Sequence, residues 1–180
     1  MTTYTWKEAF EDAHEAAKAG SPRSQNFVGY CYDIGKGVRK NPKLALYWIE
    51  KAAKTGYLEA IFNLALMNDL GQGTGVDTKK AFRLYKAAAQ RGHLQAQSNL
   101  AIAYLDGQGV KKNATEGLRW LRRAAQRGDN KAQYNLGRAY LDGEGVPRSL
   151  SRARTWLQKA AKNHHAKAKL ALKRLDRTTA

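Results

Sequence analysis

The stretch that decides the fold is Ala132-Gln-Tyr-Asn-Leu-Gly-Arg-Ala-Tyr-Leu-Asp-Gly-Glu-Gly-Val146. Nearly the same letters occur 36 residues earlier, at Ala96-Gln-Ser-Asn-Leu-Ala-Ile-Ala-Tyr-Leu-Asp-Gly-Gln-Gly-Val110. Weaker copies begin at Ala60 and at Ser24, at the same interval. Self-similarity at one fixed period is typical of stacked repeats, in which each repeat buries its apolar face only against its neighbours. The sequence therefore predicts about four repeats of 36 residues.

Each period contains two helical patterns joined by a Gly-x-Gly loop. Because these glycines recur at the end of every first helix, they indicate a turn rather than a phosphate-binding loop. We expect first helices over 23–34, 59–70, 95–106 and 131–142, and second helices over 42–54, 78–90, 114–126 and 150–162. Residues of good N-cap type precede the second helices at one spacing, namely Asn41, Asp77, Asn113 and Ser149.

A lone helix is predicted at each end of the array. Residues 5–19 begin with Thr5 and Glu8 at the spacing of a capping box, and they end at Gly20 in the way a second helix ends. Residues from Ala168 to about Arg177 have the pattern of a first helix that lacks its second helix. Such end helices close a stack, although they could also stack onto another copy of the chain, which leaves an oligomer open.

Several columns of the repeat predict buried packing. The repeated Asn63, Asn99 and Asn135 are expected to bond the backbone between helices, and Cys31 falls in a column of small core residues, which favours a structural thiol. Small residues recur along both helices of each repeat, which would let the helices approach closely. Large residues on the second helices are expected to fill the space between repeats and not to form a ligand cage; they are Trp48, Leu84, Trp120 and Trp156.

These residues resemble the Sel1-like repeat family, a helix-turn-helix solenoid related to the tetratricopeptide repeats. In the fourth repeat the family pattern is carried by Ala132, Leu136, Gly137, Tyr140, Gly143, Gly145, Val146, Ala153, Trp156, Lys159, Ala160 and Ala161. One local departure is His164, which stands where the pattern has a closing glycine.

The resemblance implies an all-α fold: a right-handed α-α superhelix, or solenoid, of about four 36-residue helix-turn-helix repeats plus a lone helix at each end. It implies a single domain over residues 1–180. The parts of this domain are an N-terminal capping helix (5–20), four repeats (21–56, 57–92, 93–128 and 129–164), and a C-terminal capping helix with a tail (165–180).

The family also implies a scaffold or adaptor for protein assembly, in bacteria often in signalling or host contact. Some secreted bacterial relatives carry a cysteine pair in each repeat, whereas this chain has only Cys31 and resembles the disulfide-free kind. We therefore expect a non-enzymatic interaction module that binds a protein or peptide segment in the concave groove lined by the first helix of each repeat.

The composition of the chain indicates its cellular compartment and shows an unusual net charge. One cysteine, no secretory leader pattern and no apolar run long enough to span a membrane predict a cytoplasmic protein. The net charge is +17, and residues 111–180 carry 18 basic against 5 acidic side chains. Such a surface could steer acidic proteins, nucleic acid or anionic lipid; the alternative is a solvated helical surface that keeps the protein soluble.

No pattern in the chain carries catalytic or cofactor chemistry. It contains no nucleophile elbow, phosphate-binding glycine loop or paired-cysteine zinc spacing. The adjacent His164 and His165 lack a third clustered ligand, so we expect them to be exposed and to bind no metal. The sequence predicts neither an enzyme nor a cofactor.

Positions that vary between repeats while sharing one face of the first helix are the best candidates for a binding site. Offsets of four and three residues place them in one stripe, and aromatic, aliphatic and Arg side chains are the types that anchor peptides in grooves. The alternative is that the stripe packs against the neighbouring repeat. The predicted stripe consists of Asn26, Tyr30, Asp33, Phe62, Leu66, Asp69, Ser98, Ile102, Tyr134 and Arg138.

A second candidate surface is basic and lies on the second helices. It would bind nucleic acid or an acidic protein electrostatically, with a strong dependence on salt. Nucleic acid is not favoured, because its binding usually needs exposed aromatic side chains among the basic ones, and the aromatic residues here are mostly assigned to the core. The predicted basic surface consists of Arg119, Arg122, Arg123, Arg152 and Lys159.

Overall fold

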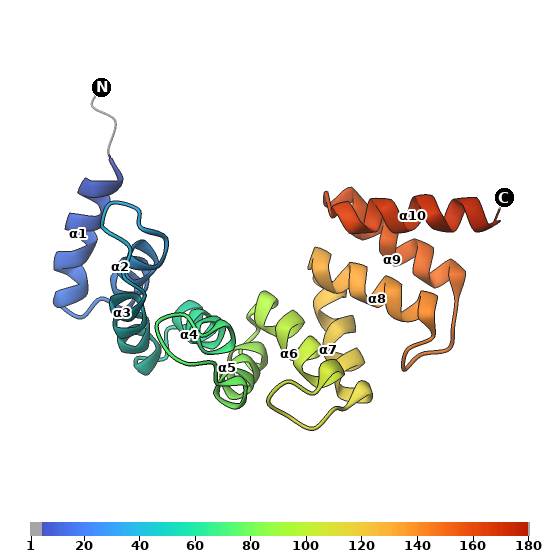
Figure 1. The fold of residues 1–180 in the computed structure, drawn as a ribbon, viewed down its shortest axis with the longest axis horizontal. Helices are drawn as coiled ribbons and strands as arrows, with labels where there is room; N and C mark the ends of the chain where they lie inside the picture. The colour runs from blue at the N-terminus through green and yellow to red at the C-terminus, as the bar shows by residue number, and fades with distance from the viewer. Residues whose placement is uncertain (1–4, 180) are drawn as a thin grey trace. The chain divides into compact units, whose positions relative to one another are not determined.

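The computed structural model describes residues 5–179, with side chains through residue 177, and over this span it consists of helices and connecting loops without strands. Every helix expected from the sequence is present, with ends that differ by one or two residues at most, so the all-α prediction is confirmed (Figure 1). The helices are α1 (Trp6–Lys18), α2 (Pro22–Ile34), α3 (Pro42–Lys54), α4 (Leu58–Leu70), α5 (Thr78–Gln90), α6 (Leu94–Asp106), α7 (Ala114–Gln126), α8 (Asn130–Asp142), α9 (Leu150–Lys162) and α10 (Ala166–Thr179).

The chain divides into two compact units, with the boundary between His93 and Leu94. In the first unit each helix packs against the next along the chain, from α1 to α5. The second unit is built in the same way, from α6 to α10. The first helices of the repeats are thus α2, α4, α6 and α8, and α10 stands in the same register. The single domain over residues 1–180 stays a prediction.

Side-chain caps begin the second helices as the sequence predicts. Asn41, Asp77, Asn113 and Ser149 each accept a hydrogen bond from the backbone N–H three residues ahead. Each cap satisfies one of the backbone donors that a helix start leaves without a partner, which is worth about 1 kcal/mol. At the N-terminal end, Thr5 and Glu8 form the predicted capping box. Local sequence therefore sets where these helices start.

The loop between the two helices of a repeat closes with the same bond each time. The N–H of the cap residue donates to a carbonyl in the last turn of the first helix, as from Asn41 to Tyr32 at 2.8 Å and from Asp77 to Asn68 at 2.8 Å. The glycines of the Gly-x-Gly pairs have positive φ, which confirms the turn. Gly73 must also be glycine for space, because a Cβ there would lie 2.2 Å from the carbonyl oxygen of Pro42.

The two helices of a repeat cross closely at a pair of small residues. A Cβ on Gly29 would lie 2.5 Å from Cγ1 of Ile49, and one on Gly137 would lie 2.8 Å from Cγ of Leu157. In the third repeat the glycine is on the second helix instead, where a Cβ on Gly117 would lie 3.1 Å from the carbonyl oxygen of Ala101. Contacts this short leave no room for another methyl group.

The large residues of the second helices lie where the sequence predicts, though not equally deep. Trp48 and Trp120 are buried in the core, whereas Leu84 and Trp156 are half-buried. Lys159 lies over the open face of the Trp156 ring, with Nζ 4.6 Å from the ring centroid. The large side chains therefore fill the space between helices at two positions, and at the other two they remain partly exposed to water.

Buried amides join neighbouring repeats. The Nε2 of Gln25 donates to the carbonyl of Ala17 at 3.1 Å, and in the second unit Gln133 makes the equivalent bond to Ala125 at 3.1 Å. Asn63, which we expected to bond backbone, instead donates to Oδ1 of Asn26 in the preceding repeat at 2.9 Å. The two glutamine bonds are buried, so they fix the alignment of the helices that they join.

The close crossing at Gly137 yields a test of stability. Gly137→Ala should lower the free energy of unfolding by up to about 2 kcal/mol, because overpacking costs about 1–3 kcal/mol and a gain in helix propensity of about 1 kcal/mol offsets part of it. Urea denaturation followed by circular dichroism measures the change. Adding Leu157→Val should make the loss smaller than the sum of the two single losses. A Gly137→Ala variant more stable than the wild type by the full gain in helix propensity, about 1 kcal/mol, would contradict the close crossing.

A candidate binding groove between first helices

The predicted stripe residues lie at three depths. Phe62 and Ser98 are buried, with 8% and 3% of their surface exposed. Tyr30, which is 44% exposed, and Arg138 stand out from the surface. The remaining members are half-buried: Asn26, Asp33, Leu66, Asp69, Ile102 and Tyr134. A partner could therefore reach eight of the ten residues, and the two buried ones fit the alternative that the stripe packs inward.

Phe62 is buried because a side chain from further along the chain covers it. Its ring stacks on the imidazole of His93, with ring centroids 4.3 Å apart, and it also contacts the ring of Tyr85. His93 in turn lies 3.1 Å from a carboxylate oxygen of Glu59. Phe62 thus belongs to the core of the first unit, where a ring of its size contributes to stability through burial.

Three grooves run between neighbouring first helices, and stripe residues line each of them. The smallest, about 60 Å³, lies between α2 and α4 and is lined by Tyr30, Asp33 and Leu66, with Asn63 and Met67 beside them. A groove of about 590 Å³ lies between α6 and α8, and one of about 810 Å³ lies between α8 and α10. The stripe residues that line the two larger grooves are Ile102, Tyr134 and Arg138.

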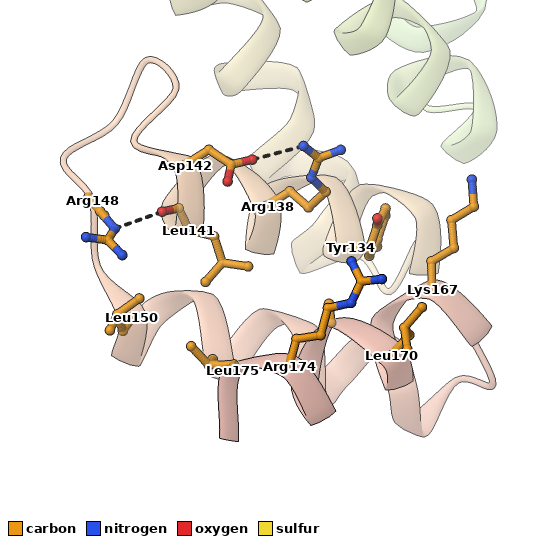
Figure 2. A pocket seen from close by; sticks show the side chains of 11 residues that line it. Tyr134, Arg138, Leu141, Asp142, Arg148, Leu150, Lys167, Leu170, Arg174 and Leu175 are labelled. Atoms are coloured by element: carbon orange, nitrogen blue, oxygen red, sulfur yellow. Dashed lines mark hydrogen bonds and ion pairs between the residues drawn. The ribbon is translucent and has the colours of Figure 1, made fainter. Parts of the chain in front are cut away.

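The groove between α8 and α10 combines apolar and charged walls (Figure 2). Arg138 pairs with Asp142 on the next turn of α8, at 3.0 Å, and this pair raises the pKa of the Arg138 guanidinium. Arg148 donates from Nε to the carbonyl of Leu141 at 3.0 Å. The apolar lining comes from Leu141, Leu150, Leu170, Ala171 and Leu175, and Tyr134 lies among them.

Half of this groove comes from α10, which the predicted stripe does not include. Leu170 and Arg174 lie 36 residues after Tyr134 and Arg138, so they extend the same columns onto the last helix. Both line the groove, together with Lys167. The signal that finds them is the repeat period itself, applied once more to a helix already predicted to be a fifth first helix.

The end of the groove depends on a neutral histidine. His165 stacks on Tyr134, with ring centroids 4.6 Å apart, and its Nδ1 accepts the N–H of Ala168 at 3.3 Å, which caps the start of α10. Burial lowers the pKa of His165, and the nearby Lys167 and Lys131 lower it further. A protonated ring would lose the cap and put a positive charge at a helix N-terminus, where the helix dipole disfavours it.

The predicted basic residues are all exposed on the second helices. Arg119 and Arg123 lie over the ring of Trp120, with Cζ 5.0 and 5.4 Å from its centroid, and Arg119 also pairs with Glu116 at 2.7 Å. Arg152 lies over Tyr140 at 5.6 Å, and Lys159 lies over Trp156. These side chains therefore cover aromatic rings of the core while their charged ends face solvent, as long cationic side chains commonly do.

An exposed lysine on α10 is relevant to the prediction that copies of the chain stack end to end. Lys173 of α10 occupies the column that holds Gly29, Ala101 and Gly137 in three of the repeats, and it is exposed. A helix from a second copy would have to displace this lysine to pack as a second helix does. An oligomer stays a prediction, and α10 as it stands is suited to ending the stack.

The described residues show no cluster of side chains that could form a metal centre. Within residues 5–179, no three His, Cys, Asp or Glu side chains lie close enough together to hold a metal ion. Cys31 is a buried free thiol, and burial raises its pKa, which makes the reactive thiolate scarce. In this part of the chain we also find no helix with the length and apolar character needed to cross a membrane.

The chain belongs to the Sel1 repeat family. The sequence model of the Sel1 repeat matches four consecutive segments, 22–57, 58–93, 94–129 and 130–165. Each matched segment contains one first helix, its glycine loop and one second helix. Proteins of this family generally serve as protein-interaction scaffolds.

The proteins similar to this chain include two solved structures and one curated protein. A protective antigen of uropathogenic Escherichia coli with an SLR fold is 36% identical, with a TM-score of 0.84 over 88% of this chain and 34% of its own. A Sel1 repeat protein from Oxalobacter formigenes is 34% identical, with a TM-score of 0.81 over 94% of this chain and 49% of its own. The chitin synthase regulator SKT5 of Saccharomyces cerevisiae is 50% identical over 46 residues, which are 26% of this chain and 7% of that protein. The chain therefore spans less than half of each of these proteins.

Because His165 caps α10 in its neutral form, we expect the stability of the folded chain to depend on pH. Because its pKa in the folded chain lies below the ordinary value of 6.5, the unfolded chain binds more protons and stability must fall as the pH drops through that value. Thermal unfolding followed by circular dichroism should show this loss between about pH 7 and pH 5.

The variant His165→Asn isolates this effect, because asparagine offers a capping oxygen that does not titrate. The decrease in melting temperature over this pH range should be smaller in His165→Asn than in the wild type. An equal decrease in both proteins would show that His165 is not the group responsible.

Proposed function

We propose that this chain is a non-enzymatic interaction module that binds a protein segment along the first helices of its repeats. The observation that carries the proposal is the position of the three grooves, each of which lies between neighbouring first helices. The general role of Sel1 repeat proteins as interaction scaffolds supports it. The buried free thiol of Cys31 suits the reducing cytoplasm that we propose for the protein.

The chemistry of the groove walls supports a peptide or protein partner. The grooves include one column that differs in every repeat, which consists of Tyr30, Leu66, Ile102 and Arg138. Apolar and aromatic side chains beside charged ones give both burial and direction to a bound segment. A scaffold of regular repeats can hold such residues rigidly, which lowers the entropy lost on binding.

Electrostatic binding through the basic second helices is the alternative function. The exposed guanidinium of Arg122 and the cations over Trp120 and Trp156 favour it, since they form a positive outer surface on the second unit. Binding of this kind would weaken steeply with salt for nucleic acid and would need no groove residue. The two functions therefore depend on different residues of the chain.

A pair of matched variants separates these functions. The groove variant carries Tyr30→Ala, Leu66→Ala and Arg138→Ala, and it leaves the buried Phe62 in place so that the core is intact. The outer-face variant carries Tyr47→Ala, Lys86→Ala and Arg122→Ala, which remove exposed side chains of the second helices instead. Proteins cross-linked to the full chain in its native cell are quantified by mass spectrometry.

The groove variant should lose at least tenfold of its specific cross-linked partner, because removing each anchor residue typically costs more than about 1 kcal/mol and the variant removes three. The outer-face variant should retain the partner, and both variants should melt near the wild-type temperature. Loss of the partner from the outer-face variant alone, with strong salt dependence, would favour the electrostatic function. No difference between either variant and the wild type would remove support for both.

A further inference from the structure

We infer that the groove between α8 and α10 binds an acidic segment of a partner protein that also carries leucine-like side chains. The inference rests on the proposed function and adds the chemical character of the partner. It depends on three features of the groove, namely its apolar lining, its charge, and its difference from the equivalent groove one repeat earlier.

The apolar lining is open to a ligand. Leu170 of α10 is 51% exposed and Leu150 of α9 is 38% exposed, whereas Leu175 and the half-buried Tyr134 close the groove from below. Exposed leucines that face a groove of about 810 Å³ can be buried by a ligand's own apolar side chains, which is favourable at about 25 cal/mol for each Å² removed from water. The volume is in the range of pockets that enclose small ligands or several side chains.

The positive charge of the groove lining favours an acidic segment. Four cationic side chains, Arg138, Arg148, Lys167 and Arg174, line the groove with a single carboxylate, that of Asp142. Asp142 is already paired with Arg138. In Figure 2 Arg174 of α10 projects between Leu175 and Leu170 toward Tyr134, and Lys167 stands at one end, so carboxylates of a bound segment would meet positive charge beside the apolar lining. Complementary charge of this kind raises the association rate and disfavours basic partners.

The groove between α6 and α8 is also lined by leucines, Leu105 and Leu118, but it differs from the last groove in charge and at two apolar positions. It is lined at equivalent positions by Ala114 in place of Leu150 and by Ala139 in place of Leu175. Its two cations, from Lys112 and Arg138, are balanced by the carboxylates of Asp106 and Glu144. The repeat thus supplies a similar groove twice, and only the second of them is both leucine-lined and positive.

The length of the helices limits the size of the segment. A helix of the length of α10, at 1.5 Å for each residue, is about 20 Å long, which an extended chain covers with about six residues. A nucleic acid also carries negative charge, but its phosphates would gain nothing from the leucines. We therefore favour a protein segment, and the test includes an oligonucleotide to distinguish the two.

The test selects short random peptides displayed on phage against the immobilised full chain. The enriched peptides are then synthesised with a fluorescent label and titrated by fluorescence anisotropy. We expect the enriched peptides to combine Asp or Glu with Leu, Ile, Met or Phe. Affinity should fall about tenfold when charges in the groove are reversed by Lys167→Glu with Arg174→Glu.

The same helix provides the matched control. Lys169→Glu with Lys173→Glu makes the same change in net charge on α10 at exposed residues that do not line the groove. This control should leave the affinity nearly unchanged. For the apolar part, Leu170→Ser should weaken binding, whereas Leu70→Ser, at a leucine that is 62% exposed on α4, should not.

Several outcomes would overturn the inference. These are enriched peptides without an excess of acid, a failure to enrich any peptide, and equal losses from the two charge-reversed pairs. A random single-stranded oligonucleotide could bind the wild type and lose binding only in Lys167→Glu with Arg174→Glu. That result would show that the groove binds a phosphate-bearing ligand and not a protein segment. Peptides that depend on Tyr30 and Leu66 but not on α10 would leave the proposed function standing without this inference.

Discussion

The close crossing of the two helices within each repeat is the constraint on which the rest of the structure depends. It requires glycine at Gly29 and Gly137, and in the third repeat it requires Gly117 on the opposite helix. At each of these crossings one helix contributes a glycine. The two helices therefore lie so close that a Cβ on the glycine would overlap the facing helix, and the two helices form one packed pair. The capped starts of the second helices and the turn glycines then hold the connection between the two helices in one conformation.

Such packing separates residues that build the stack from residues that are free to vary. The Gly-x-Gly turn uses the same positions in every repeat, and the buried Gln25 and Gln133 stand in one column of the repeat and make equivalent bonds. The positions between neighbouring first helices carry no such requirement. Evolution of a binding surface in a repeat protein can therefore proceed at these positions without loss of the fold. The last groove differs most from a plain stacking surface, because Leu150, Leu170 and Arg174 add apolar area and charge there.

Much of the fold could be predicted because its determinants are local and repeated. Asn41 and Asp77 cap helices through bonds to residues three positions away, which a sequence displays directly. The depth of a stripe residue could not be predicted in this way. Phe62 is buried by His93, a contact that comes from outside the column, and Tyr134 stacks in the same way on His165 two repeats later. Leu170 and Arg174 could have been predicted from the period, whereas the role of His165 as a cap depends on side-chain geometry that the period does not encode.

The central claim is that partners bind on the first helices rather than on the second. Oxidative footprinting of the full chain tests it most directly, with and without its captured partner, because two tyrosines of similar exposure lie on the two kinds of helix. Tyr30 on α2 is 44% exposed and Tyr47 on α3 is 50% exposed. The account predicts that the partner protects Tyr30, or the leucine-lined groove at Leu170, while Tyr47 stays as reactive as in the free chain. Protection of Tyr47 with Tyr30 and Leu170 unchanged would contradict it.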